Sequence, residues 1–279
     1  MAELVSGQIT SLSSRVKRLL APNPGPFTGA GTNTYIVGND AVAVIDPGPL
    51  IDSHIDKILS EAAERIRWII LTHTHVDHSP AAAVLKERLG AQVEVLGMPS
   101  KQQGLSFDGQ FKADRVLGHD DVIQSNEFTL RAIFTPGHAA NHLCYFLEEE
   151  QWLFCGDQLM EGSTVIIAPP DGNMADYIQS LELLLSYPIS TIAPAHGNLM
   201  PDAHAVIRHT IKHRLKREEK VLIALRENGA LAMNELVTRV YDDVPVFMHL
   251  LASQSLLAHL QKLEAEGRVR QQAEQWLLV

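Results

Sequence analysis

The stretch that organises this sequence is residues 71–80, which read Leu71-Thr72-His73-Thr74-His75-Val76-Asp77-His78-Ser79-Pro80. It places three imidazoles and one carboxylate within six positions, directly after an apolar run, 68–71, that is typical of a buried strand. Ser79 and Pro80 predict a helix start, with Ser79 as the N-cap and Pro80 as the first helical residue. The polar side chains are therefore expected on a strand-to-helix turn, where a rigid scaffold presents loop residues. Imidazole and carboxylate ligands suit a borderline divalent ion, zinc first, so we interpret the turn as a metal site.

Length and composition limit the classes of protein to consider. The chain has 279 residues, enough for one large domain with a small appendage. No apolar run approaches the roughly 20 residues that span a bilayer, and no secretory pattern is expected at the N-terminus. Its 23 basic and 33 acidic residues give a net charge of −10, which disfavours nucleic acid at long range. Cys144 and Cys155 are expected to be reduced core residues, which favours a cytoplasmic location.

The order of predicted elements favours an α/β sandwich. Residues 35–37 and 41–45 are predicted strands joined by a hairpin turn at Gly38-Asn39-Asp40. Helices are predicted at 52–65, at 80–89 ending at Gly90, and at 176–185. Further strands are predicted at 93–96, 128–134, 143–147, 152–155 and 191–193. A β-rich order with helices after some strands, and polar residues at strand ends, indicates two sheets flanked by helices rather than one parallel sheet.

The character of the chain changes near residue 203, which suggests domains at 1–203 and 204–279. A long helix is predicted over 204–226, with a basic patch of Arg208, His209, Lys212, His213, Arg214, Lys216, Arg217 and Lys220. Two helices at 233–241 and 247–266 and two short strands at 268–270 and 276–279 then predict a winged helix. The second of these helices is expected to bury one face, which consists of Leu250, Leu251, Leu257, Leu260 and Leu263.

One turn cannot enclose a catalytic metal, so single ligands are expected at other strand ends. Three residues fit this requirement, because each follows an apolar strand and a small residue: His138 after Thr135-Pro136-Gly137, Asp157 after Gly156, and His196 after Pro194-Ala195. A lone histidine at a strand end more often packs than ligates. Four loops of the same kind together make a metal centre the better interpretation.

The motif His73-Thr74-His75-Val76-Asp77-His78, followed by His138, Asp157 and His196, resembles that of the metallo-β-lactamase-fold hydrolases. The resemblance implies a four-layer αβ/βα sandwich with two divalent ions, most simply zinc, with manganese or iron as alternatives. It also implies that His73, His75 and His138 hold the first ion, that Asp77, His78 and His196 hold the second, and that Asp157 bridges them. The lactamase-β-like subfamily, with its small winged-helix-like tail, is the more similar branch. Its supporting stretches are 21–29, 31–35, 135–138 with His142, and 176–181.

The resemblance further implies a hydroxide shared by the two ions as the nucleophile. Asp77 is the expected catalytic residue, which orients that nucleophile. His142 is expected either to donate a hydrogen bond to the substrate or to orient His138. Asn33 and Tyr177 are expected to line the substrate site, whereas Pro169-Pro170-Asp171-Gly172 is a local departure near it.

The same ligands also indicate which substrate classes to expect. In family terms, His75 argues against the oxygen-reducing di-iron branch, and Asp157 argues against true β-lactamases. Hydrolysis of a small ester or thioester and cleavage of single-stranded RNA stay open. RNA binding requires a basic track and stacking aromatics, but aromatics make up only 6% of the chain. Duplex DNA is disfavoured because the last predicted helix is poor in cations. A winged-helix regulator that senses a ligand without turnover is a third hypothesis, and the sequence leaves the oligomeric state open, a homo-oligomer included.

Overall fold

The computed structural model describes residues 4–104 and 106–279, which form two compact units. The first unit comprises Met1–Thr135, Asn141–Ser163 and Pro188–Ala203, and the second comprises Pro136–Ala140, Thr164–Tyr187 and His204–Val279. We describe each unit by itself. The sequence-defined boundary at residue 203 stays a prediction.

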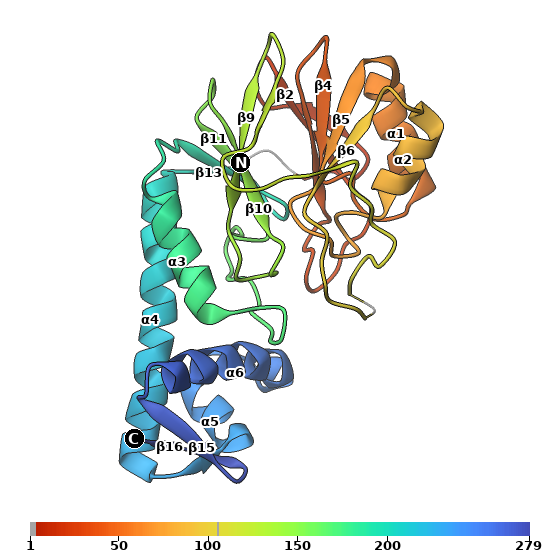
Figure 1. The fold of residues 1–279 in the computed structure, drawn as a ribbon. Helices are drawn as coiled ribbons and strands as arrows, with labels where there is room; N and C mark the ends of the chain where they lie inside the picture. Colours follow the sequence, from red (N-terminus) through yellow and green to blue (C-terminus); the bar gives the residue numbers. More distant parts are fainter. Residues whose placement is uncertain (1–3, 105) are drawn as a thin grey trace. The chain divides into compact units, whose positions relative to one another are not determined.

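Two mixed sheets make up the first unit (Figure 1). The first sheet has the order β1-β2-β3-β4-β5-β6-β7, with strands at Ile9–Ser11, Val16–Leu20, Asn33–Val37, Val42–Ile45, Ile66–Ile70, Glu94–Gly97 and Arg115–Val116. The second has the order β13-β12-β11-β10-β9-β8, with β8 to β13 at Val122–Gln124, Thr129–Phe134, Leu143–Leu147, Trp152–Gly156, Thr191–Pro194 and Met200–Pro201. Strands β4 to β7 are parallel, and so is the pair β11 and β12. The predicted α/β sandwich of two sheets is confirmed.

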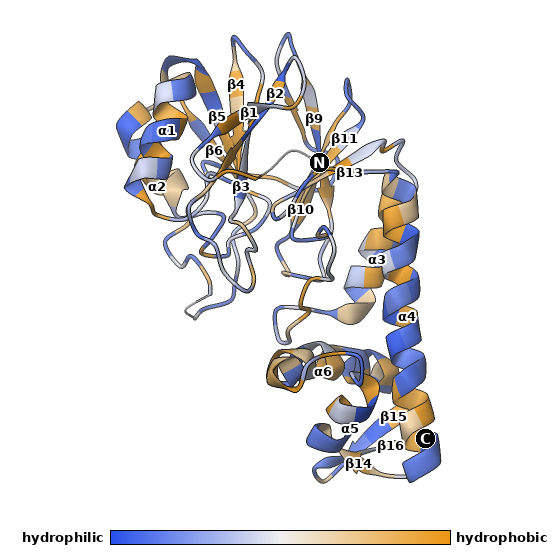
Figure 2. Ribbon diagram, turned by 180° about the vertical axis from the view of Figure 1, so that it is seen from behind, coloured by the Kyte–Doolittle hydropathy of each residue, from blue (hydrophilic) through white to orange (hydrophobic). Residues whose placement is uncertain are grey.

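Apolar side chains explain how the layers hold together. One buried cluster joins the inner faces of the two sheets and includes Tyr35, Ile70, Tyr145 and Phe154. A second cluster joins the outer face of the first sheet to helices α1 (Asp52–Ala62) and α2 (Ala81–Leu89), which cover it in Figure 1. Hydrophobic residues accordingly recur along the sheet strands in Figure 2. Each Å² of apolar surface that is buried contributes about 25 cal/mol, so these two interfaces are the main source of stability of the first unit.

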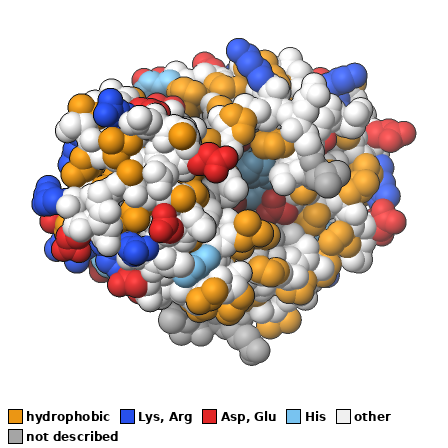
Figure 3. Space-filling model, turned by 90° about the horizontal axis from the view of Figure 1, so that it is seen from below, with side chains coloured by type: hydrophobic (Ala, Val, Ile, Leu, Met, Phe, Trp, Pro, Cys, Tyr) orange, Lys and Arg blue, Asp and Glu red, His pale blue; other side chains and the backbone are white. Residues whose placement is uncertain are grey.

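The parallel strands determine where the functional loops lie. Because β4, β5 and β6 run in the same direction, their C-terminal ends meet at one edge of the first sheet. The turn 71–80 follows β5 at that edge, and Asp46 follows β4. The C-terminal ends of the parallel strands β11 and β12 likewise present Asp157 and His196 together. Seen from below, histidine and acidic side chains are visible near the centre of the surface (Figure 3).

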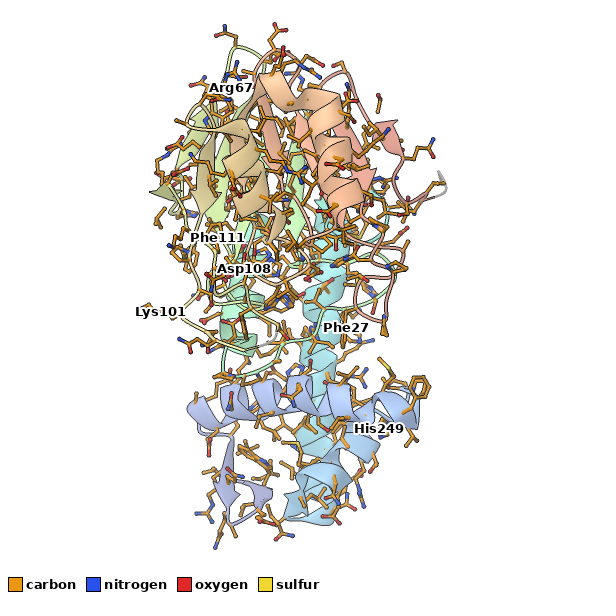
Figure 4. The ribbon with its side chains drawn as sticks, turned by 90° about the vertical axis from the view of Figure 1, so that its right-hand side faces the viewer. Phe27, Arg67, Lys101, Asp108, Phe111 and His249 are labelled. Atoms are coloured by element: carbon orange, nitrogen blue, oxygen red, sulfur yellow. The ribbon has the colours of Figure 1, made fainter. Side chains whose placement is uncertain are left out.

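The start of helix α2 differs from the prediction. The helix begins at Ala81, Pro80 occupies the cap position, and no side chain caps it. The Ser79 hydroxyl instead donates to Oδ2 of Asp108 over 2.8 Å. The predicted N-cap role of Ser79 is therefore wrong, because its hydroxyl ties the turn to the loop after β6. Asp108 and Phe111 lie side by side on that loop (Figure 4).

The second unit contains helices α3 (Met174–Leu184), α4 (Ala203–Asn228), α5 (Met233–Val240) and α6 (His249–Ala265). A three-stranded sheet of order β14-β16-β15 completes the winged helix, with strands at Leu231–Ala232, Gln275–Leu278 and Val269–Gln272. Its core includes Leu225, Leu236, Leu260 and Trp276, and the predicted winged helix is confirmed. Within the described residues, no helix combines the length and the apolarity needed to cross a bilayer.

Two details of this unit correct the sequence analysis. Leu250 is 78% exposed rather than part of the buried face of α6, whereas Ser255 and His259 are buried. The basic patch on α4 is also smaller than predicted, because Arg214 and Arg217 are buried. Arg217 pairs with Asp243, and Lys220 pairs with Asp242. A helical wheel shows which residues share a face but does not show which neighbours cover that face.

Candidate metal centre

A hydrogen-bond chain that begins at Asp46 sets the orientation of His73. The carboxylate of Asp46 accepts from the backbone N–H of Thr72 over 2.8 Å and from its hydroxyl over 2.7 Å. Because the hydroxyl donates its one hydrogen bond to Asp46, its oxygen accepts from Nδ1–H of His73, 3.1 Å away. This arrangement leaves Nε2 of His73 with a lone pair, and Nε2 lies 2.9 Å from Nδ1 of His75.

The same carboxylate fixes the tautomer of His78. Nδ1–H of His78 donates to Oδ2 of Asp46 over 2.9 Å, so Nε2 is the ring nitrogen left to face the other predicted ligands. That nitrogen is buried and has no hydrogen-bond partner among the described residues. It faces Oδ2 of Asp77 at 3.4 Å and Oδ1 of Asp157 at 3.5 Å.

His196 is held in the same way from another strand end. Its Nδ1–H donates to the carbonyl of Gly31 over 3.1 Å, and its Nε2 lies 3.3 Å from Oδ2 of Asp77 and 3.2 Å from Oδ1 of Asp157. The loop that carries His196 is fixed by Asn33, whose side-chain amide donates to the carbonyls of Pro194 over 3.0 Å and Gly197 over 2.8 Å.

The first unit thus brings six of the seven predicted ligands together. The ligand atoms of His73, His78 and Asp157 lie within 4.8 Å of one another, and so do those of Asp77, His78 and His196. His75 joins through its contact with His73. No single secondary-structure element supplies this cluster, because Asp157 and His196 follow β11 and β12 of the other sheet.

Electrostatics within the cluster is dominated by burial and by its two carboxylates. Burial opposes the charge on His78, but Asp77, Asp157 and Asp46 raise the pKa of His78 well above its ordinary value. Burial also opposes the charge on His196, and Asp157 and Asp77 outweigh it to raise the pKa of His196 to about 10. For Asp157, burial alone would raise the pKa, but His196 and His78 hold it well below its usual range. Burial, with repulsion from His78 and His75, lowers the pKa of His73.

Gly156 explains how Asp157 can approach the turn. Its φ of +49° is in the left-handed region, and a Cβ there would lie 2.6 Å from Oγ1 of Thr72 and 2.7 Å from Nε2 of His142. A side chain at position 156 would therefore push against the residues that support the cluster.

The remaining predicted site residues have the following places. His142 is fully buried. Its Nδ1 lies 3.0 Å from the Thr135 hydroxyl, and its ring centroid lies 5.1 Å from that of His73, a geometry that suits positioning better than substrate contact.

Tyr177 and His138 belong to the second unit. Tyr177 is buried with the Arg214 guanidinium 5.2 Å from its ring centroid, and Nδ1–H of His138 donates to the Ile166 carbonyl over 2.9 Å. In the same unit Asp171 accepts from the backbone N–H of Ala140. The role of His138 as a ligand of the first ion stays a prediction, as do the substrate roles of His142, Asn33 and Tyr177.

Asp46 is the functional residue that sequence reasoning missed. It supports both His73 and His78, with a φ of +48°. Its signal is present in the sequence, because Asp46-Pro47-Gly48 directly follows a buried strand, as Asp157 and His196 do. A search of strand ends for metal ligands alone passes over Asp46, because its carboxylate supports ligands instead.

A sandwich of two mixed sheets with buried histidines and aspartates at its strand ends defines a metal-dependent hydrolase of the α/β class. Residues 27–196 match the Metallo-beta-lactamase superfamily, and the chain belongs to this superfamily. Residues 233–276 match the Beta-lactamase associated winged helix domain.

Individual relatives agree with this assignment. The chain is 30% identical over 267 residues to the Beta-lactamase-like protein 2 homolog of Caenorhabditis elegans, and the match covers 94% of this chain and 88% of the relative. It is 33% identical over 252 residues to the Atrochrysone carboxyl ACP thioesterase of Aspergillus chevalieri, with 85% and 76% covered. A metallo-beta-lactamase family protein from Thermus thermophilus shares the fold, with a TM-score of 0.79, 21% identity, and 96% and 100% of the two chains covered.

Proposed function

We propose that the chain hydrolyses esters or thioesters with two divalent ions, most simply zinc. His73, His75 and His138 would hold one ion, Asp77, His78 and His196 the other, and Asp157 both. The observation that carries the proposal is the orientation of His78 and His196. In each residue one ring nitrogen is tied down by a hydrogen bond, and the other points at Asp77 and Asp157 over 3.2–3.5 Å.

The donor set fits a metal ion. A buried imidazole nitrogen without a hydrogen-bond partner among the described residues, as in His78, is costly unless a cation or proton occupies the space it faces. Imidazole nitrogens with carboxylate oxygens are the ligands of zinc and its neighbours in the first transition row. When bound, two such ions lower the pKa of water and polarise the carbonyl under attack.

Asp77 is the proposed catalytic residue. Burial would raise its pKa, but His78 and His196 outweigh burial and hold it well below its usual range. Its side chain keeps 24% of its surface exposed, whereas His78 is inaccessible. Asp77 is thus a charged, acceptor-only group that solvent reaches, and it can accept a hydrogen bond from an attacking water and fix the orientation of that water.

A thioester or ester is the favoured substrate class. The Atrochrysone carboxyl ACP thioesterase relatives support it through their names. Two exposed apolar side chains accompany the ligands: Val76, between His75 and Asp77, is 42% exposed, and Phe27, on the loop between β2 and β3, is 55% exposed (labelled in Figure 4). Phe27 lies four residues before Gly31, whose carbonyl holds His196. Apolar groups at these positions suit an acyl chain better than a phosphodiester backbone.

Metal analysis and a substrate panel test the proposal. Zinc- and manganese-loaded protein would be assayed on a glutathione thioester, a generic phosphodiester and single-stranded RNA. We expect turnover of the thioester. RNA cleavage without thioester turnover would contradict it, and no turnover at all would favour the winged-helix regulator. His75→Ala should fold, bind less metal and lose nearly all activity, so full activity in that variant would refute the site.

We also propose a cytoplasmic location. Cys144 and Cys155 are both buried and form no disulfide with each other, which supports a reducing compartment. Burial raises the pKa of Cys144 to about 12, so this thiol stays protonated and unreactive. Cell fractionation tests the location.

A further inference from the structure

A shallow groove runs between α3 and α4 of the second unit, which lie side by side in Figures 1 and 2. Its volume is about 440 Å³, and it is separate from the residues of the candidate metal centre. Two residues from α3 and its C-terminal end and six of α4 line it, namely Glu182, Leu185, Arg208, Ile211, Lys212, Leu215, Lys216 and Glu219.

The floor of the groove is apolar. Ile211 and Leu215 are one helical turn apart on α4, so their side chains lie on the same face, and Leu185 at the end of α3 faces them. Leu215 is 46% exposed, although α4 is hydrophilic along this part of its length in Figure 2. An apolar strip bordered by polar residues is the usual form of a surface that binds another protein.

The border of the groove is basic. Arg208, Lys212 and Lys216 follow one another at intervals of four residues, which places them in one row along α4. All three are exposed, and no ion pair or side-chain hydrogen bond engages them among residues 4–104 and 106–279. Arg217 and Lys220 of the same helix, by contrast, pair with Asp243 and Asp242.

The charge of the groove is opposite in sign to that of the whole protein. Its lining has three cations against the two carboxylates Glu182 and Glu219, whereas the chain as a whole carries a net charge of −10. The groove is therefore a local region where an acidic partner meets attraction rather than repulsion.

The length of the groove fits one short helix. From Arg208 to Glu219, α4 rises about 16 Å, which corresponds to three turns of a partner helix. An amphipathic helix would place its apolar stripe on Ile211 and Leu215 and its carboxylates beside the basic row. Single-stranded nucleic acid fits less well, because the lining contains no aromatic side chain on which a base could stack.

We propose that this groove binds an acidic amphipathic helix of a protein that carries the substrate's acyl group as a thioester. The proposal rests on the thioesterase function proposed above. Recognition is divided between the two parts of the groove. The row of Arg208, Lys212 and Lys216 attracts and aligns the carrier, and the apolar floor supplies the contact that holds it.

A binding experiment tests the groove directly. The probe is an acidic acyl carrier protein that bears an octanoyl group on its phosphopantetheine arm through a non-cleavable thioether. Its Kd would be measured for the wild type, for Lys212→Glu with Lys216→Glu, and for the control Lys57→Glu with Arg226→Glu. The control changes the net charge equally at two exposed residues outside the groove. We expect roughly tenfold weaker binding for the groove variant, a change of less than about twofold for the control, and weaker wild-type binding as salt increases.

Three results would overturn the docking site: no carrier binding by the wild type, equal Kd values for groove and control variants, or groove-dependent binding of single-stranded RNA in place of the carrier. Turnover of octanoyl-pantetheine separates this failure from failure of the proposed function. If the wild type hydrolyses that small thioester and the groove variant keeps its rate within about twofold, the thioesterase function holds, and any failure concerns the docking site alone. If the metal-loaded wild type hydrolyses no thioester, the proposed thioesterase function is refuted, and the proposal of an acyl carrier as the partner is refuted with it.

Discussion

Nδ1 of His78 donates a hydrogen bond to Oδ2 of Asp46 over 2.9 Å, and both side chains are buried. Oδ2 also accepts from the Thr72 hydroxyl, while Oδ1 accepts from the backbone N–H of Thr72. The carboxylate of Asp46 therefore accepts from three donors. This relationship makes it the residue on which the orientation of two proposed ligands depends.

Replacing Asp46 with Asn should weaken metal binding without removing a ligand. The amide has one acceptor oxygen, so its NH₂ group must face either the backbone N–H of Thr72 or both the Thr72 hydroxyl and Nδ1 of His78. In the second case His78 must present a lone pair at Nδ1 and a proton at Nε2, which cannot ligate. We expect zinc affinity to fall roughly 10- to 100-fold, measured by competition with a chelator. Asp56→Asn, at an exposed position of α1, is the matched control, and equal affinities in the two variants would contradict the role of Asp46.

Gly156→Ala should destabilise the protein more than Gly162→Ala. Both glycines have φ in the left-handed region, +49° and +69°, so each substitution carries a conformational cost of about 1 kcal/mol. Only at Gly156 does the new Cβ also meet Thr72 and His142 within 2.7 Å, whereas Gly162 has open space. We expect an additional loss of about 1–3 kcal/mol in the free energy of unfolding of the metal-free protein, measured in urea. Similar losses in both variants would show that the loop yields without strain.

The sequence predicted the ligand-bearing turns more reliably than their supports. The motif from His73 to His78 and the strand ends before Asp157 and His196 are local patterns, and the structure gathers them at one edge. Asp46, Gly156 and Asn33 act through contacts with Thr72, His142 and the 194–197 loop. These contacts join distant segments and leave no periodic trace. The burial of Arg217 could not be predicted for the same reason. The residues that contact its guanidinium, Tyr241 and Asp243, lie after α5 and far from Arg217 in the sequence.

His54 should make folding sensitive to mild acid. The side chain is buried and its Nε2 lies 2.9 Å from the Thr34 hydroxyl, and burial lowers the pKa of His54 from 6.5 to about 4. The unfolded chain therefore binds the proton first. The stability contributed by neutral His54 is complete above about pH 6.5 and is lost as pH falls toward about 4, by on the order of 3 kcal/mol.

Urea unfolding at about pH 7, 5.5 and 4 measures this effect. His54→Gln should flatten the fall in the free energy of unfolding between about pH 6.5 and 4. His209→Gln, at an exposed position of α4, should leave it unchanged. If the wild type and the His54 variant lose stability in parallel, burial of His54 is not a source of the acid sensitivity.

Arg217→Ala should destabilise the winged helix far more than Lys220→Ala, although both cations pair with neighbouring aspartates. The guanidinium of Arg217 donates to both carboxylate oxygens of Asp243 over 2.6 and 3.1 Å and to the Val240 carbonyl over 2.6 Å, and it lies 4.3 Å from the centroid of the Tyr241 ring. Its side chain is only 7% exposed, so its removal leaves a cavity and an unpaired carbonyl. The partner of Lys220, Asp242, is largely exposed, and such pairs contribute little. We expect losses of roughly 2–3 kcal/mol for Arg217→Ala and less than about 1 kcal/mol for Lys220→Ala in the urea unfolding of the full chain. Equal losses would mean that the Arg217 contacts add nothing beyond a surface ion pair.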